Sequence, residues 1–195
     1  VLVNYTGVAY PNLIGQQDED DLPVVETACG GIFMFRREVY EQVGGFDEDL
    51  FLYHEDHDLS WRIRLGGWKL MVTPKSVCSH HYDFNKGVQK FYRSEKNRLH
   101  IILKNLESKT LILISPALII VELAQIVHAL MHGWLRLKVK SYFEILGQFP
   151  QIARKRRKIR SFRKVSDKEI TRLYQGTIAV SGIKNPLMDY VLSPL

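Results

Sequence analysis

A run of ten residues, Tyr-His-Glu-Asp-His-Asp-Leu-Ser-Trp-Arg from Tyr53 to Arg62, concentrates the side chains best suited to acid–base chemistry. Glu55, Asp56 and Asp58 stand where residues 55–65 are predicted to begin a helix, and a helix N-terminus favours ionised carboxylates. An ionised carboxylate at the edge of a cleft can act as a general base. Helix capping by Asp58 or a neighbour would give the same pattern, so catalysis and capping both remain open at this point.

Two histidines, His80 and His81, follow a predicted strand at residues 76–79. The acidic run lies about 25 residues upstream, with a helix, a turn and a strand between. Such a connection can return a strand end to a helix start, where one imidazole and external carboxylates could bind a metal. A structural histidine is the alternative, and the spacing does not decide between them.

The elements expected to position these residues alternate between strands and helices. Strands are predicted at 27–35 and 68–72, and helices at 36–43, 55–65 and 87–106. The glycine pairs Gly44-Gly45 and Gly66-Gly67 are expected to end the first two helices.

Several motifs in order resemble family 2 glycosyltransferases, and among them the rhamnosyltransferase-like and galactofuranosyltransferase-like members. The resemblance runs from about Thr27 to Leu106. Its motifs are Gly30-Gly-Ile-Phe-Met-Phe-Arg-Arg-Glu-Val-Tyr-Glu-Gln-Val-Gly-Gly-Phe-Asp-Glu48, Tyr53-His-Glu-Asp-His-Asp-Leu-Ser-Trp-Arg62, Gly66-Gly-Trp68, Ser76-Val-Cys-Ser-His80, Phe91-Tyr92 and Asn97-Arg98.

The resemblance implies an α/β fold: the C-terminal, acceptor-side part of a GT-A (Rossmann-like) domain, followed by membrane-associated helices. It also implies an inverting transfer from a nucleotide-sugar donor to a lipid-linked or polysaccharide acceptor in cell-envelope glycan synthesis. Asp56 would be the catalytic base, Glu55 its partner, and His80 a ligand of a divalent metal, Mn²⁺ or Mg²⁺. The residues expected to bind substrate are Gly30, Gly31, Asp58 and Arg62.

One departure from the family pattern concerns the donor-binding half, whose Asp-x-Asp motif normally precedes the Gly-Gly strand. Asp18-x-Asp20 and Asp47-x-Asp49 match the motif by letters, but neither is assigned to it because both are expected in loops or on the wrong side of the fold. The alternative to an enzyme is therefore a non-catalytic membrane-anchored fragment or partner subunit without the donor half.

The second half of the chain changes character. Thr110–Met131 is apolar over a membrane-spanning length, with a polar stripe at Glu122, Gln125 and His128. It could span a membrane, lie in the interface, or pack on the catalytic part. Residues 134–174 carry 13 Lys and Arg against 3 Asp and Glu, a net charge of +10 that leaves −4 for the remainder.

Topology favours the interfacial arrangement, because nucleotide sugars and strongly basic segments both belong on the cytoplasmic side. The basic run at 154–164 predicts contact with anionic lipid, and a solvated helix face is the alternative. Nucleic acid is not expected as a partner, because Phe162 is the one aromatic residue in that run. The expected division is 1–106 catalytic part, 107–133 apolar helix, 134–174 basic tail and 175–195 extension, at the cytoplasmic face of the cell membrane.

Overall fold

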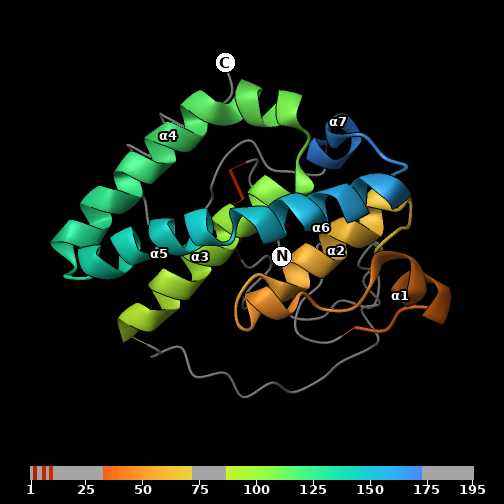
Figure 1. Ribbon diagram of the computed structural model, residues 1–195, viewed down its shortest axis with the longest axis horizontal. Helices are drawn as coiled ribbons and strands as arrows, with labels where there is room; N and C mark the ends of the chain where they lie inside the picture. Colours follow the sequence, from red (N-terminus) through yellow and green to blue (C-terminus); the bar gives the residue numbers. More distant parts are fainter. Residues whose placement is uncertain (1, 4–5, 8, 11–32, 72–86, 173–195) are drawn as a thin grey trace, which may run out of the picture.

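The computed structural model describes residues 2–3, 6–7, 9–10, 33–71 and 87–172, and helices dominate this part of the chain (Figure 1). Strands β1 (Leu2–Val3) and β2 (Ala9–Tyr10) form a short antiparallel ladder in which Leu2 lies opposite Tyr10. The helical elements are α1 (Arg37–Val43), the 3-10 turn η1 (Glu48–Leu50), α2 (Glu55–Leu65), α3 (Gly87–Asn105), α4 (Ser108–Met131), α5 (Leu135–Gly147), α6 (Phe149–Phe162) and α7 (Asp167–Thr171).

The predicted α/β class, the C-terminal part of a GT-A (Rossmann-like) domain, is wrong for the described residues. Their sheet consists of the two-residue strands β1 and β2, and the rest is helix or irregular chain. The described parts of the predicted strands, Phe33–Phe35 and Trp68–Leu70, pack as irregular segments against α1 and α2. The side chains of Phe33, Phe35, Trp68 and Leu70 are partly buried against helices and not against another sheet layer. The remainder of those predicted strands lies outside the described residues.

Helix α2 forms the centre of the described fold. Every residue from His57 to Leu65 is buried. Trp61 and Leu65 pack with Ile101 and Ile102 of α3 and with Ile159 of α6 in one apolar cluster. The predicted helices at 36–43, 55–65 and 87–106 are confirmed within one residue at each end, and Gly44 and Gly66 follow α1 and α2 as predicted.

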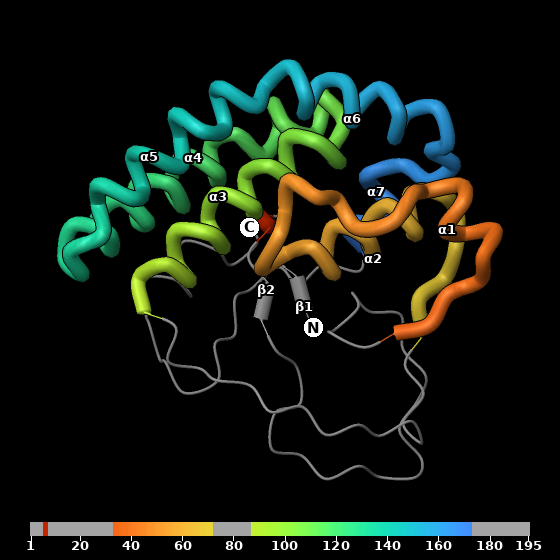
Figure 2. Tube along the Cα trace, turned by 60° about the horizontal axis from the view of Figure 1, so that its bottom comes forward, coloured from red at the N-terminus to blue at the C-terminus, as the bar shows by residue number. Residues whose placement is uncertain are grey.

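Helices α4, α5 and α6 form an arc over α3 and α2 (Figure 2). The chain after α6 is fixed to the end of α2, because the backbone N–H groups of Lys164 and Val165 donate to the carbonyl of Leu65 at 2.7 and 3.3 Å. The helix of the basic segment therefore packs directly on the predicted catalytic part. The four-part division predicted above stays a prediction.

Candidate functional site

The loop that leads into α2 has a strained backbone. Tyr53 and His54 both have left-handed φ angles, 72° and 65°, a conformation that non-glycine residues adopt at an energetic cost. Helix α3 holds the loop in place. The side-chain amide of Asn97 donates to the carbonyls of Leu52 (2.9 Å) and Tyr53 (2.7 Å), and His54 Nε2 lies 3.2 Å from Ser94 Oγ. Strain held by such contacts is typical of functional sites.

This loop presents Glu55 and Asp56 at the first turn of α2, where both are partly buried. Burial raises the pKa of both carboxyl groups above the ordinary value. Asp56 Oδ1 accepts the backbone N–H of His57 at 2.7 Å, while Glu55 Oε2 is buried without a hydrogen-bond partner among the described residues. A carboxylate with a raised pKa accepts a proton more readily than one in water, as a general base requires.

His54 and His57 lie beside these carboxylates. The Nδ1 atoms of the two histidines are 3.3 Å apart, and the His57 ring stacks on Trp61 with centroids 5.5 Å apart. Burial lowers the pKa of His54 to about 4 and that of His57 to about 3, so both rings are neutral near pH 7. The two rings therefore share one hydrogen bond. Being neutral, they add no positive charge to the site.

The depressed pKa of His57 gives a testable pH dependence of folding. His57 stays neutral in the folded protein, whereas a histidine in the unfolded chain protonates near pH 6.5. The contribution of the neutral, buried ring to the free energy of unfolding is therefore complete above pH 6.5. That contribution is lost as the pH falls from about 6.5 towards the folded pKa of about 3. Between pH 7 and pH 5, the free energy of unfolding should fall by about 2 kcal/mol less in His57→Phe, which keeps a stacking ring, than in the wild type. Urea unfolding at both values measures this, with the exposed His132→Phe as control; equal pH slopes in wild type and His57→Phe would contradict it.

Asp58 and Arg62 occupy a different side of α2. Asp58 is 0% exposed and accepts from Arg62 Nε (2.8 Å) and Asn105 Nδ2 (2.9 Å), with Lys104 Nζ at 2.7 Å. Burial alone would raise the pKa of Asp58, but the Lys104 and Arg62 cations hold it far below its usual range. Arg62 also donates to the carbonyls of Val43 and Gly45, each at 2.8 Å.

This geometry makes Asp58 and Arg62 parts of the internal framework that joins α2 to the Gly44-Gly45 turn and to α3. The predicted substrate-binding role of both residues stays a prediction. Asp56 and Asp58 are two residues apart, about 200° around the helix, so Asp56 faces away from this ion cluster.

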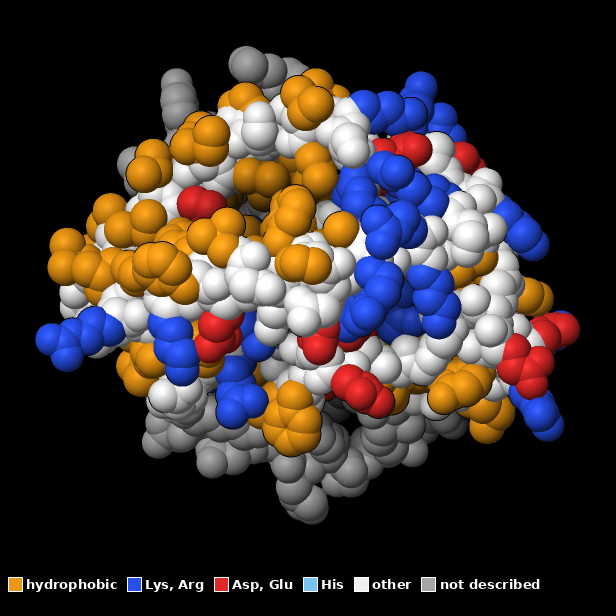
Figure 3. All heavy atoms as spheres, viewed as in Figure 1, with side chains coloured by type: hydrophobic (Ala, Val, Ile, Leu, Met, Phe, Trp, Pro, Cys, Tyr) orange, Lys and Arg blue, Asp and Glu red, His pale blue; other side chains and the backbone are white. Residues whose placement is uncertain are grey.

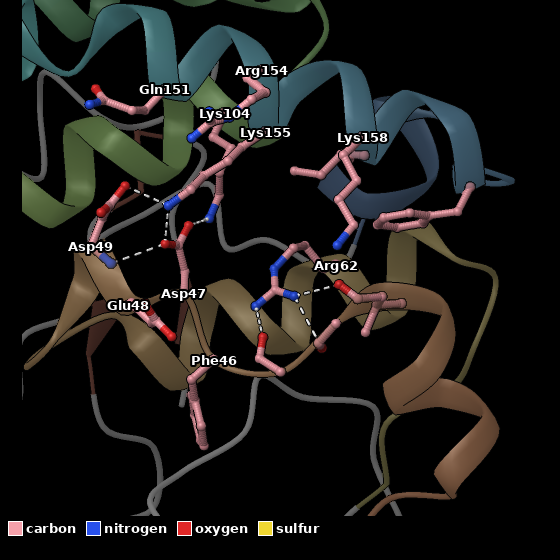
Figure 4. Close-up of a pocket in the computed structure, with 15 residues that line it drawn as sticks. Phe46, Asp47, Glu48, Asp49, Arg62, Lys104, Gln151, Arg154, Lys155 and Lys158 are labelled. Atoms are coloured by element: carbon pink, nitrogen blue, oxygen red, sulfur yellow. Dashed lines mark hydrogen bonds and ion pairs between the residues drawn. The ribbon is translucent and has the colours of Figure 1, made fainter.

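A pocket of about 480 Å³ lies between the loop after α1 and helix α6 (Figure 4). Asp47 and Asp49 project into it from the loop, and Lys155 of α6 binds both carboxylates. Lys104 of α3 makes a second ion pair with Asp47. The predicted basic tail thus places one partly buried cation, Lys155, on two carboxylate partners.

Spacing alone would permit a metal ion at Asp47, Asp49 and His100, whose ligand atoms lie within 4.8 Å of one another. Their surroundings do not fit one. Burial would raise the pKa of Asp47, but the Lys104 and Lys155 ammonium groups lower it below its ordinary value. A divalent cation would have to displace both lysines, so this cluster fits internal ion pairs and carries no metal chemistry.

Three predicted site residues, Gly30, Gly31 and His80, lie outside the described residues, and their roles stay predictions. Conversely, sequence reasoning assigned no role to Ser94 or Asn97, which hold the loop before Asp56. A signal for Asn97 was present, because the Asn97-Arg98 pair belongs to the motifs that carry the family resemblance.

Comparisons with known proteins bear on the family resemblance. Residues 23–86, which include the strained loop and α2, match the family model described as the N-terminal domain of galactosyltransferase. The chain is 40% identical over 58 residues to N-acetylglucosaminyl-diphospho-decaprenol L-rhamnosyltransferase of two Mycobacterium tuberculosis strains, which covers 30% of this chain and 19% of the relative. These matches support the resemblance to family 2 glycosyltransferases over part of the chain.

A second relative agrees with this glycosyltransferase assignment. Rhamnosyltransferase WbbL of Escherichia coli strain K12 is 33% identical over 72 residues, which covers 36% of this chain and 27% of the relative. The resemblance to rhamnosyltransferase-like members is thus confirmed, over segments that span about a fifth to a quarter of the relatives' length. No solved structure gives a significant match.

Proposed function

We propose that the full-length protein is an inverting glycosyltransferase that moves a sugar from a nucleotide-sugar donor to a lipid-linked or polysaccharide acceptor. The observation that carries the proposal is the Glu55–Asp56 pair, presented by a strained loop inside the segment that matches glycosyltransferases. The acceptor class is taken from the Mycobacterium relatives, whose name specifies a diphospho-decaprenol carrying N-acetylglucosamine. The rhamnosyltransferase names also make rhamnose the first sugar to test.

In the proposed reaction, Asp56 removes the proton from the acceptor hydroxyl group. The acceptor oxygen then bonds to the anomeric carbon, on the face opposite the nucleotide. The bond between that carbon and the donor diphosphate breaks, and the diphosphate leaves with the electron pair. Attack from the opposite face inverts the configuration at the anomeric carbon. Burial supports the role of Asp56, because it raises the pKa of the carboxyl group that must take the proton.

Two further expectations belong to this proposal. The family resemblance implies a divalent cation, Mn²⁺ or Mg²⁺, with His80 as a ligand. We also propose that the enzyme acts at the cytoplasmic face of the cell membrane, because nucleotide sugars are cytosolic and a lipid-linked acceptor is held in the bilayer.

The proposal predicts sugar transfer by the full-length protein. Incubation with a rhamnose nucleotide and a polyprenyl-diphospho-N-acetylglucosamine should release the nucleotide and give a disaccharide lipid of inverted anomeric configuration, measured by mass spectrometry and NMR. Other nucleotide sugars serve as donor controls. EDTA should abolish transfer and added Mn²⁺ should restore it.

Two results would contradict this proposal in different ways. Transfer that is unaffected by EDTA would remove the metal and leave the enzyme. No transfer from any donor in the panel would favour the alternative of a non-catalytic, membrane-anchored subunit.

A further inference from the structure

Helix α4 presents an uncovered apolar face. It has 24 residues and a mean hydropathy of 2.2, so by length and composition alone it could cross a membrane. Large apolar side chains that lie within about 100° of one another around the helix form a continuous stripe, with exposed fractions between 47% and 78%. They are Ile112, Leu113, Ile120, Leu123, Val127 and Leu130. A stripe of this size in contact with water is unfavourable, which indicates a binding surface.

The opposite side of α4 is tied to the protein by ion pairs. Glu122 binds Arg98 of α3 and lies 2.9 Å from Lys138 of α5. Tyr142 of α5 donates its hydroxyl to Glu122 at 2.7 Å, and Gln125 donates to Glu95 of α3 at 3.2 Å. Arg98 and Lys138 are at most 1% exposed.

A membrane-spanning α4 would have to break this network. Glu122 would enter hydrocarbon, and the buried Arg98 and Lys138 would each lose a counter-charge, which is strongly destabilising. The network therefore favours an α4 that stays on the protein and exposes only its apolar stripe. Of the three arrangements open from the sequence, this geometry therefore disfavours the span.

The exposed surface continues from α4 onto α5 and α6. Phe143 and Leu146 of α5 are 69% and 67% exposed. Figure 3 shows apolar side chains over α4 and α5 on the same face as a dense group of Lys and Arg side chains over α6. The cations of α6 that remain exposed include Arg154, Arg157 and Arg160. An apolar surface beside a cationic one matches the acyl and headgroup layers of an anionic membrane.

A second, smaller pocket lies at the border of the two surfaces. It measures about 390 Å³ and is lined by Ser108 and Lys109 of α4 and by Arg156, Arg160 and Arg163 of α6 and its C-terminal end. Lys104 and Glu107 complete its charged lining, so five cations face one carboxylate, and Glu107 lies 3.3 Å from Lys109 and 3.8 Å from Arg163. Ile112 and Leu113 lie one helical turn beyond Ser108 and Lys109 on the same side of α4. Burial lowers the pKa of Arg156, and the Arg160 and Arg163 cations lower it further against the opposing effect of Asp167 and Glu107. This pocket therefore suits a phosphate at the edge of an apolar surface.

We propose that α4, α5 and α6 form a membrane-docking face. Helix α4 lies in the interface of an anionic bilayer with its apolar stripe in the acyl layer. The cations of α6 contact lipid phosphates, and the pocket at Arg156 and Arg160 holds one of them. This surface is independent of the proposed sugar transfer, so either proposal can fail without the other.

The test measures binding of the full-length protein to vesicles of phosphatidylcholine, with and without phosphatidylglycerol. We expect anionic vesicles to bind at least about tenfold more tightly at low salt. Arg157→Gln/Arg160→Gln should weaken binding to anionic vesicles about 10- to 30-fold. Leu113→Asn/Leu123→Asn should weaken binding to both kinds of vesicle.

The matched control is Arg36→Gln/Arg37→Gln on and beside α1. It removes the same charge from exposed positions, and vesicle affinity should not change. Equal losses in the α1 and α6 variants would overturn the docking face, because charge alone would then account for binding. Absence of vesicle binding, with self-association through the apolar stripe in its place, would also overturn it.

Topology gives a readout that does not depend on affinity. With Cys29 and Cys78 replaced by serine, cysteines introduced by Ser161→Cys and Lys69→Cys should react with an impermeant reagent from the same side of sealed membranes. Both positions are exposed, and in the sequence Lys69 comes before α4 and Ser161 after it. Labelling from opposite sides would show that α4 crosses the membrane.

Discussion

Asp56→Asn in the full-length protein is expected to lower kcat of the proposed sugar transfer by at least about 100-fold, with little change in KM for the donor. In the proposed reaction the carboxylate removes a proton in the transition state, and an amide of the same shape could not accept it. Burial raises the pKa of Asp56, so its loss removes a base stronger than an ordinary aspartate. Steady-state kinetics with saturating acceptor measure the effect.

Glu55→Gln is the matched control, because it changes the neighbouring carboxylate in the same helical turn. We expect a smaller decrease in kcat than for Asp56→Asn. If Glu55→Gln is the more damaging change, the two roles are reversed. Turnover near the wild-type rate in Asp56→Asn would remove Asp56 from the chemistry, provided that both variants unfold at the wild-type temperature.

Asp58→Ala is expected to destabilise the protein by about 3–5 kcal/mol, although Asp58 lies only two residues from the proposed base. The change leaves Lys104, which is 1% exposed, without one of its two carboxylates, and it also releases Arg62 and Asn105. Urea unfolding measures the loss. The exposed pair of Arg37 and Glu41 provides the control, since Glu41→Ala should cost about 1 kcal/mol or less.

The pH dependence of this effect has a defined sign. The pKa of Asp58 is depressed in the folded state, so its stabilisation is complete above the unfolded value of about 4. It is lost only as the pH falls through the much lower folded value. Asp58→Ala should therefore cost the same at pH 7 and at pH 5. A loss below about 1 kcal/mol at pH 7 would show that Asp58 is not part of the framework.

Helix positions were predictable here because the signals are local. Gly44 and Gly66 end α1 and α2, and α3 follows a helical apolar pattern. The sheet was not predictable in the same way. The apolar run at Phe33–Phe35 satisfies a strand pattern, but in the structure it covers helices α1 and α2.

In the candidate site, too, residues in local motifs were predictable and partners distant in sequence were not. A family resemblance in consecutive motifs pointed to Glu55 and Asp56, which the structure brings to the first turn of α2. The partners of Asp58 could not be predicted, because Asn105 lies 47 residues further along the chain. Nor does spacing show that Lys155, more than 100 residues from Asp47 and Asp49, neutralises both carboxylates.

The packing of α6 and α7 determines where this protein can be shortened. Ile159 and Ile170 complete the apolar cluster around Trp61 and Leu65, and Lys164 is hydrogen-bonded to the last turn of α2. A truncated form that ends before α6 would lose the basic surface of that helix. It would also expose the apolar core that packs against α2, the proposed catalytic helix. Soluble forms are better sought by replacing outward-facing residues of α4, such as Ile120 and Leu123, and keeping the chain intact to Thr171.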